Sequence, residues 1–147
     1  MIEPFNDEFF MNEALKEANK ALYLDEVPVG AVIVLDNKII SRAHNYVQTL
    51  KDTTAHAEMQ AITMASASLG GKYLNECIMY VTLEPCVMCT GAIFWSKIPQ
   101  LVFGAKDKKN GFLSVSSRIL NKKTQVRGGV MEYECKKILL DFFAKKR

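Results

Sequence analysis

The sequence predicts a single α/β domain, residues 1–147, in which helices pack against one mixed sheet. A chain of 147 residues has the size of one ordinary domain, and it buries roughly two thirds of the surface that its unfolded form exposes. Its 49% hydrophobic and 24% charged residues are typical of a globular protein with a core. Strand-like and helix-like segments alternate along it, which is the pattern of α/β proteins.

The first half of the chain predicts a helix, a β-hairpin and a second helix. Apolar residues spaced by three and four positions indicate the helices, because they fall on one helical face. Asp36 and Asn37 separate two β-rich runs and tolerate the positive φ of a tight turn. Gly70 and Gly71 can close the second helix. The expected elements are a helix from Asp7 to Leu22, strands at 29–35 and 38–41, a polar loop at 45–54, and a helix from Met59 to Leu69.

The second half predicts a strand–helix–strand unit, which implies a parallel pair with a right-handed crossover. Pro85 suits the first turn of the helix, where its missing N–H has no partner to lose. Residues 106–123 show no clear period, so no element is predicted there. The expected elements are a strand at 77–83, a helix from Pro85 toward Ser96, a strand at 100–105, a weaker strand at 124–126, and a helix from about Met131.

The net charge of +3 hides an asymmetry along the chain. Residues 1–96 carry 6 Lys or Arg against 12 Asp or Glu, whereas residues 97–147 carry 13 against 4. The basic part is a candidate phosphate-binding surface. A solvated set of lysines that keeps the protein in solution explains the same charges equally well.

We expect a cytoplasmic protein. No apolar run approaches the roughly 18 residues that a membrane span requires, and the opening segment is acidic where a secretory signal is basic. Four cysteines would allow two disulfides in a secreted protein. In an intracellular chain, a close Cys-x-x-Cys pair favours metal or redox chemistry instead.

A His-x-Glu motif and a Pro-Cys-x-x-Cys motif stand at the starts of the second and third helices. Cys86 and Cys89 are three residues apart and therefore project from one helical face, so both sulfurs can reach one ion. We expect two adjacent parallel strands to bring these helix starts side by side, which delivers His56 to the two cysteines. The sequence therefore predicts a zinc site, one Zn²⁺ per chain, with His56, Cys86 and Cys89 as its ligands.

A fourth protein ligand is hard to find. Cys77 begins the strand that leads to Cys86 and lies roughly 20 Å away along it, Cys135 suits a buried apolar position, and His44 falls in a loop. Structural zinc sites fill four protein positions, whereas catalytic sites leave one for water, so a catalytic site is predicted. Glu58 can then take the water's proton and pass it to a leaving group.

Taken singly, these elements have simpler explanations: a redox pair for the cysteines, a structural role for His56, and a contact with the helix dipole for Glu58. Together, in this order, they form the signature of the zinc-dependent nucleobase deaminases. Beyond it, much of the chain resembles the bacterial tRNA-specific adenosine deaminases. The segments that carry the resemblance are 27–32, 43–45, 54–58, 80–89, 101–105 and 141–143.

The resemblance implies a three-layer α/β/α cytidine-deaminase-like fold with a mixed five-stranded sheet, a homodimer, and conversion of adenosine to inosine at the wobble position of a tRNA anticodon stem-loop. It also implies that Asn45 contacts the nucleoside, that the Ala57 N–H faces the reacting centre, and that Glu84 receives the exocyclic amine. Val29 and Phe143 would wall the pocket. Residues 111–117 and 122–125 depart from the family's usual sequence.

Two other functions stay open from the sequence. The same metal centre could deaminate a free base or nucleoside, such as guanine, cytosine or adenosine, and this needs no basic surface. A non-enzymatic zinc or redox module is the third hypothesis. The enzymatic and non-enzymatic hypotheses differ in what Glu58 does, because only a deaminase needs a carboxylate that moves protons.

Overall fold

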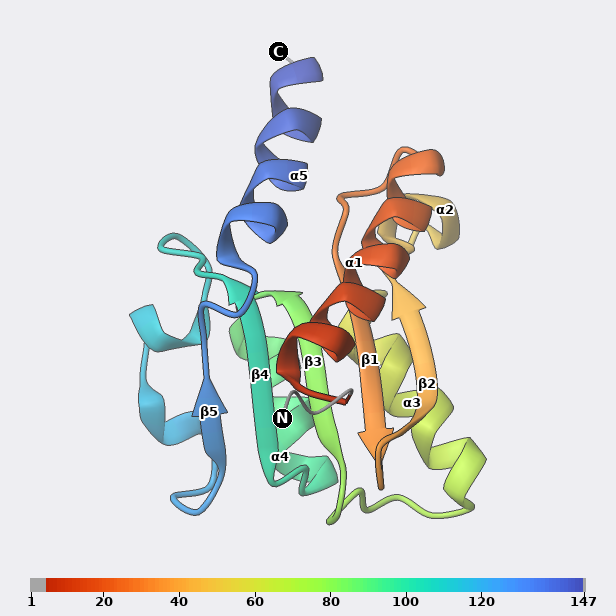
Figure 1. The fold of residues 1–147 in the computed structure, drawn as a ribbon, viewed down its shortest axis with the longest axis vertical. Helices are drawn as coiled ribbons and strands as arrows, with labels where there is room; N and C mark the ends of the chain where they lie inside the picture. Colours follow the sequence, from red (N-terminus) through yellow and green to blue (C-terminus); the bar gives the residue numbers. More distant parts are fainter. Residues whose placement is uncertain (1–4, 147) are drawn as a thin grey trace.

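A computed structural model describes residues 5–146 and contains one five-stranded sheet with helices on both of its faces (Figure 1). The fold class predicted from the sequence is confirmed. Residues 1–4 of the acidic opening segment and Arg147 of the basic end lie outside the described residues. The elements are α1 (Asp7–Tyr23), β1 (Gly30–Leu35), β2 (Lys38–His44), α2 (Val47–Leu50), α3 (Ala57–Leu69), β3 (Ile78–Leu83), α4 (Val87–Ser96), β4 (Gln100–Ala105), the 3₁₀ turns η1 (Phe112–Ser114) and η2 (Ser117–Ile119), β5 (Gln125–Arg127) and α5 (Glu132–Lys145).

The strands lie in the order β2-β1-β3-β4-β5. β1 is antiparallel to β2 and to β3, whereas β3, β4 and β5 run parallel. The predicted hairpin and the predicted parallel pair are therefore confirmed. At the hairpin turn Asp36 and Asn37 adopt φ of 50° and 60°, the left-handed geometry that the turn requires. β5 lies one residue further along the chain than predicted.

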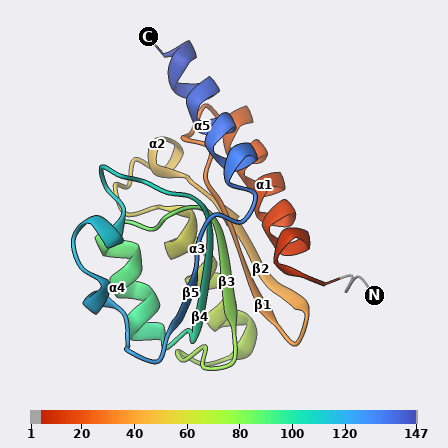
Figure 2. The ribbon, with the colours of Figure 1, turned by 60° about the vertical axis from the view of Figure 1, so that its left-hand side comes forward.

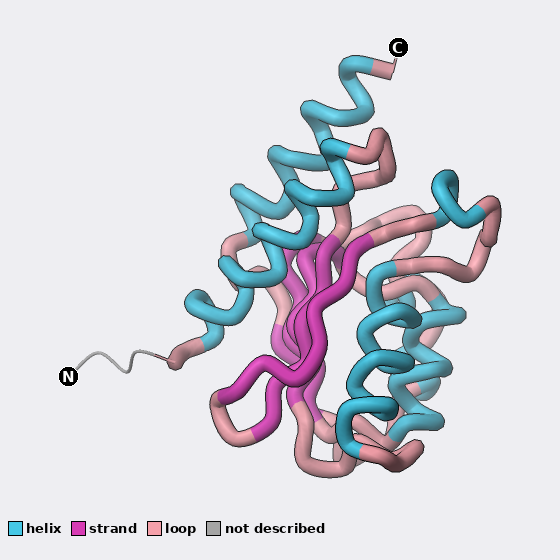
Figure 3. The backbone as a smooth tube through the Cα atoms, turned by 90° about the vertical axis from the view of Figure 1, so that its right-hand side faces the viewer, coloured by secondary structure: helices cyan, strands magenta, loops and turns pink. Residues whose placement is uncertain are grey.

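The sheet separates two hydrophobic clusters, and Figure 3 shows the helices that cover its two faces. Successive residues of β1 point to opposite faces, so Ala31 and Ile33 pack toward α3 and α4, whereas Val32 and Val34 pack toward α1. α1 approaches β1 closely at Gly30, where a Cβ would collide with the α1 backbone. α5 begins beside β4 and extends past the end of the sheet (Figure 1).

The expectation that adjacent parallel strands precede the two motif-bearing helices is wrong. β2 leads through α2 to α3, and β3 leads to α4, but β1 lies between β2 and β3 and runs antiparallel to both. The reason is the hairpin, which places β2 at the edge of the sheet and leaves β1 between β2 and β3. Since β2 and β3 still point the same way, their carboxyl ends share one edge, and both helices begin there (Figure 2).

None of the helices within residues 5–146 is both long enough and apolar enough to cross a membrane.

Candidate active site

The three predicted metal ligands meet between the starts of α3 and α4. His56 is the residue that precedes α3, Cys86 precedes α4, and Cys89 lies in the first turn of α4. His56 Nδ1 is 3.7 Å from Cys86 Sγ and 3.5 Å from Cys89 Sγ. All three ligand atoms lie within 4.8 Å of one another. The motifs thus form one metal-binding group despite the intervening strand.

These distances fit zinc. A tetrahedral Zn²⁺ with Zn–S near 2.3 Å and Zn–N near 2.0 Å places its nitrogen and sulfur ligands about 3.6 Å apart. The other candidates lie elsewhere: Cys77 and Cys135 are buried outside the group, and the Nδ1 of His44 is 3.0 Å from the carbonyl oxygen of Asn45. Within the described residues the group has three ligands, which leaves a fourth position for water.

The electrostatics at the two helix starts make Cys86 a ready metal ligand, whereas they favour the protonated forms of Cys89 and His56. A hydrogen bond from the Cys89 thiol lowers the pKa of Cys86 to about 4, and His56 contributes in the same direction. The same contact and burial raise the pKa of Cys89. The hydrogen bond with Cys86 also raises the pKa of His56, which burial opposes. Cys86 is therefore a thiolate at neutral pH, and Cys89 must release its proton when a metal binds.

Glu58 lies in the first turn of α3 and is buried, with only 4% of its surface exposed. Burial is the main reason that its pKa is raised to about 7. A carboxyl group that titrates near neutral pH can accept a proton and give it back in one cycle, which suits general acid–base catalysis. The position and the protonation behaviour of Glu58 therefore fit the predicted role.

A cleft of about 860 Å³ opens above these residues, which is large enough for a nucleoside. It is lined by residues next to the start of β1, after the end of β2 and at the start of α2, by the turn after β4, and by residues of α5. Its lining residues are Glu26, Val27, Val29, Asn45, Val47, Gln48, His56, Glu58, Leu83, Glu84, Cys86, Ala105, Lys106, Asp107, Lys108, Lys109, Asn110, Lys136, Leu139, Leu140 and Phe143.

Four of the five residues expected to bind substrate line this cleft: Val29, Asn45, Glu84 and Phe143. The fifth, Ala57, is buried beneath it, and its N–H donates to Asn45 Oδ1 over 2.9 Å. Asn45 Nδ2 donates to the Val27 carbonyl oxygen over 3.1 Å. Asn45 is therefore held in a fixed orientation, with one Nδ2 hydrogen still available.

Sequence reasoning missed Glu26, which is almost fully buried at 1% exposure. Its carboxylate accepts hydrogen bonds from the backbone N–H groups of Gln48 and Thr49 and from the Thr49 hydroxyl, over 3.0, 2.6 and 2.6 Å. These bonds fix the start of α2, which forms part of the cleft wall. The only signal in the sequence is a charged residue directly before the apolar run that begins at Val27.

The fold and site together define a hydrolytic deaminase: an α/β/α domain whose His, Cys, Cys group lies beside a buried glutamate in an open cleft. The model of the cytidine and deoxycytidylate deaminase zinc-binding region matches residues 4–105. The chain belongs to this deaminase family.

Three known proteins place the chain within the family. It is 47% identical to the tRNA-specific adenosine deaminase of Aquifex aeolicus over 144 residues, which covers 95% of each chain. A structure solved in a study of A-to-I editing by tRNA:A34 deaminases at the wobble position of transfer RNA is 43% identical, with a TM-score of 0.83, and covers 88% of this chain and 98% of the other. The structure of guanine deaminase from Bacillus subtilis is 41% identical, with a TM-score of 0.66. The match covers 69% of this chain and 65% of the other.

Proposed function

We propose that this protein is a tRNA adenosine deaminase that converts adenosine to inosine at the wobble position of an anticodon, with one Zn²⁺ held by His56, Cys86 and Cys89. The observation that carries the proposal is the three-ligand group beside Glu58, in a cleft with four lysines on its rim. Relatives with this activity in their names share up to 47% of the residues across nearly the whole chain.

The reaction adds water to adenosine and releases ammonia. A Zn²⁺ held by His56, Cys86 and Cys89 would supply a bound water that gives up a proton far more easily than bulk water does. Glu58 takes that proton and delivers it to the departing amine. The raised pKa of Glu58, about 7, suits both transfers at neutral pH.

The walls of the cleft position the nucleoside. Asn45 offers its second Nδ2 hydrogen, and Val29 and Phe143 line the cleft with apolar side chains. The Ala57 N–H is already bonded to Asn45 Oδ1, so it can face the reacting centre only if substrate binding moves that bond. Glu84 lies in the same wall as the turn after β4.

The RNA backbone is bound by the basic rim. Lys106, Lys108, Lys109 and Lys136 line the cleft, and lysines hold phosphates at positions from which a single-stranded base can be turned into the site. Bases of an anticodon loop are splayed out at low cost, because they are not paired. The enzyme therefore acts where tRNA is found, in the cytoplasm.

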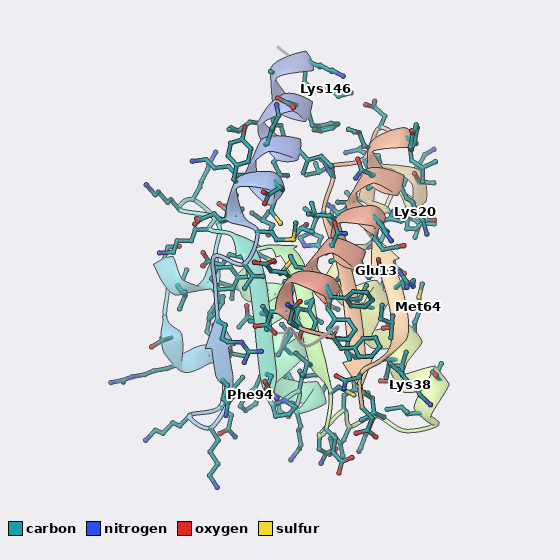
Figure 4. The ribbon with its side chains drawn as sticks, viewed as in Figure 1. Glu13, Lys20, Lys38, Met64, Phe94 and Lys146 are labelled. Carbon is teal, nitrogen blue, oxygen red and sulfur yellow. The ribbon has the colours of Figure 1, made fainter. Side chains whose placement is uncertain are left out.

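A second copy of the chain packs on the exposed apolar surface beside α4. Trp95 is 76% exposed and Val115 66% exposed, and Figure 2 shows the segment between β4 and β5 beside α4. Exposed apolar groups of this size mark interaction surfaces, and Phe94 of α4 adds to them (Figure 4). Sedimentation tests this: wild type should be a dimer and Trp95→Glu a monomer, whereas a monomeric wild type would contradict the proposal.

Deamination of a free purine is the second candidate, because the chain is 41% identical to a guanine deaminase over 69% of its length and the cleft is large enough for a free base. One experiment separates the two candidates. The protein is incubated with an arginine tRNA transcript and, separately, with guanine, cytosine and adenosine. We expect inosine at the wobble position of the tRNA and no deamination of guanine, cytosine or adenosine. Deamination of guanine without wobble inosine would select the alternative.

A further inference from the structure

Glu84 ties the turn after β4 to the metal-binding segment. It follows the last residue of β3 and precedes Pro85 and Cys86, and only 5% of its surface is exposed. The Asp107 N–H donates to its Oε1 over 3.1 Å, and the Leu113 N–H donates to its Oε2 over 3.0 Å. One carboxylate therefore holds both ends of residues 107–113.

The backbone on both sides strengthens this connection. The Glu84 N–H donates to the Ala105 carbonyl over 2.8 Å, and the Phe112 N–H donates to the Pro85 carbonyl over 2.9 Å. Three hydrogen bonds thus join two consecutive residues to the turn, and a fourth joins Glu84 to the end of β4. Because Cys86 comes next in the chain, the turn is fixed relative to the metal site.

Gly111 fits against the Glu84 carboxylate. A Cβ at Gly111 would collide with Glu84 Oε2 and Cδ, and also with the backbone carbonyl oxygen of Asp107 within the turn. The φ of Gly111 is −69°, which any residue adopts, so the absent side chain is needed for this contact and not for the backbone conformation. Gly111→Ala therefore disturbs both the contact with Glu84 and the packing against the Asp107 carbonyl oxygen, while Glu84 keeps its carboxylate; Glu84→Gln is the variant that changes the carboxylate alone.

The turn carries a cationic part of the cleft wall, since Lys106, Lys108 and Lys109 line the cleft. The Asp107 carboxylate accepts the N–H groups of Lys109 and Asn110 over 3.1 and 3.0 Å, which gives the turn a compact form of its own. The bonds to Glu84 connect this compact turn to the segment that carries Cys86. We infer that Glu84 is a positioning residue that holds the lysine-bearing turn at a fixed place beside the metal ligands, an assignment that rests on the proposed RNA substrate.

Acceptance of the substrate's exocyclic amine is the rival role for Glu84. Each carboxylate oxygen has a second lone pair, so the two roles must be separated by experiment. They differ in kinetics. A residue that positions the RNA-binding turn affects the KM of the RNA, whereas a residue that receives the leaving amine affects kcat.

The test compares zinc-loaded wild type with Glu84→Gln, Gly111→Ala and the control Gly71→Ala, whose added Cβ meets nothing. Amide hydrogen exchange of residues 107–113 is measured first, then kcat and KM on an anticodon stem-loop RNA, with zinc content and melting midpoint as checks on folding. In Glu84→Gln and Gly111→Ala we expect faster exchange at Asp107 and Leu113 and a KM raised about tenfold, as loss of a hydrogen bond to a charged group suggests, with kcat within about twofold. Gly71→Ala should match wild type.

Exchange at the wild-type rate in both variants, or a wild-type KM in both, would overturn the inference. A large fall in kcat for Glu84→Gln, with Gly111→Ala unchanged, would assign Glu84 to the amine instead. Hydrogen exchange needs no substrate, so it tests the hold on the turn even if the RNA proves not to be a substrate. If wild type makes no inosine, the proposed function is wrong. The hydrogen-exchange result would still show whether Glu84 holds the turn.

Discussion

The backbone N–H at the start of α3 is bonded to the side chain that faces the cleft: Ala57 N donates to Asn45 Oδ1 over 2.9 Å. Asn45→Ala removes this acceptor and the donor to Val27, which leaves the Ala57 N–H without this partner, whereas the Val27 carbonyl keeps its bond from the Val29 N–H. We expect a loss of about 1–3 kcal/mol in the free energy of unfolding and a higher KM. Urea unfolding and steady-state kinetics check this. A wild-type KM would show that Asn45 only supports the fold.

Removal of the metal should abolish activity. Cys86→Ser and Cys89→Ser each take away one of the three ligands, so we expect zinc content to fall from one per chain toward zero and inosine formation to stop. Cys77→Ala is the control, because Cys77 is buried outside the group. Zinc analysis by mass spectrometry checks the content. Full activity in a zinc-free Cys86→Ser protein would contradict the site.

The buried Glu26 makes stability depend on pH. Burial acts to raise its pKa, but hydrogen bonds from the Thr49 hydroxyl and from the N–H groups of Gln48 and Thr49 hold the pKa below its ordinary value. A lowered pKa in the folded state contributes stability that is present above the unfolded-state pKa, about 4.3, and is lost as the pH falls through the folded-state pKa.

Glu26→Gln should therefore lower the free energy of unfolding at pH 7 by about 1–3 kcal/mol, and the gap to wild type should narrow below about pH 4. Urea unfolding at pH 7 and pH 3 measures the difference in unfolding free energy between the variant and wild type. Glu76→Gln, at an exposed position, is the control. The same gap at both pH values would mean that the Glu26 charge is not what the hydrogen bonds stabilise.

The basic rim should give salt-dependent binding. Lys108 lines the cleft, so Lys108→Ala is expected to raise the KM for an anticodon stem-loop. The slope of log KM against log salt should fall by about 0.7 for each phosphate that the variant no longer neutralises. Lys38 is the control, since it lies at the opposite end of the sheet from α5 (Figure 4). Equal effects of Lys38→Ala and Lys108→Ala would show that only net charge matters.

The sequence predicted the elements well, and the structure brings the three predicted ligands together, because both depend on local patterns. Helix and strand positions follow from apolar spacing, and His56, Cys86 and Cys89 follow from motifs whose residues are close in the chain. The placement of β1 between β2 and β3 was missed, since it depends on pairing between strands that no local pattern records.

The structure of residues 106–123 could not be predicted for a related reason. Its start is fixed by Glu84, more than twenty residues earlier, through bonds to Asp107 and Leu113, and by the absence of a side chain at Gly111. Neither produces a hydrophobic period. Glu26 was missed likewise, because its partners include the backbone N–H groups of Gln48 and Thr49, and nearly any residue type can supply these.

Glu58→Ala tests the central claim most directly. The purified, zinc-loaded variant is assayed on an anticodon stem-loop for inosine, and its zinc content is measured in the same sample. Because Glu58 is not one of the three ligands but is the buried carboxyl beside them, we expect one zinc per chain and inosine formation at the limit of detection. Turnover close to that of wild type, with zinc bound, would contradict the role of Glu58 and the deaminase mechanism built on it.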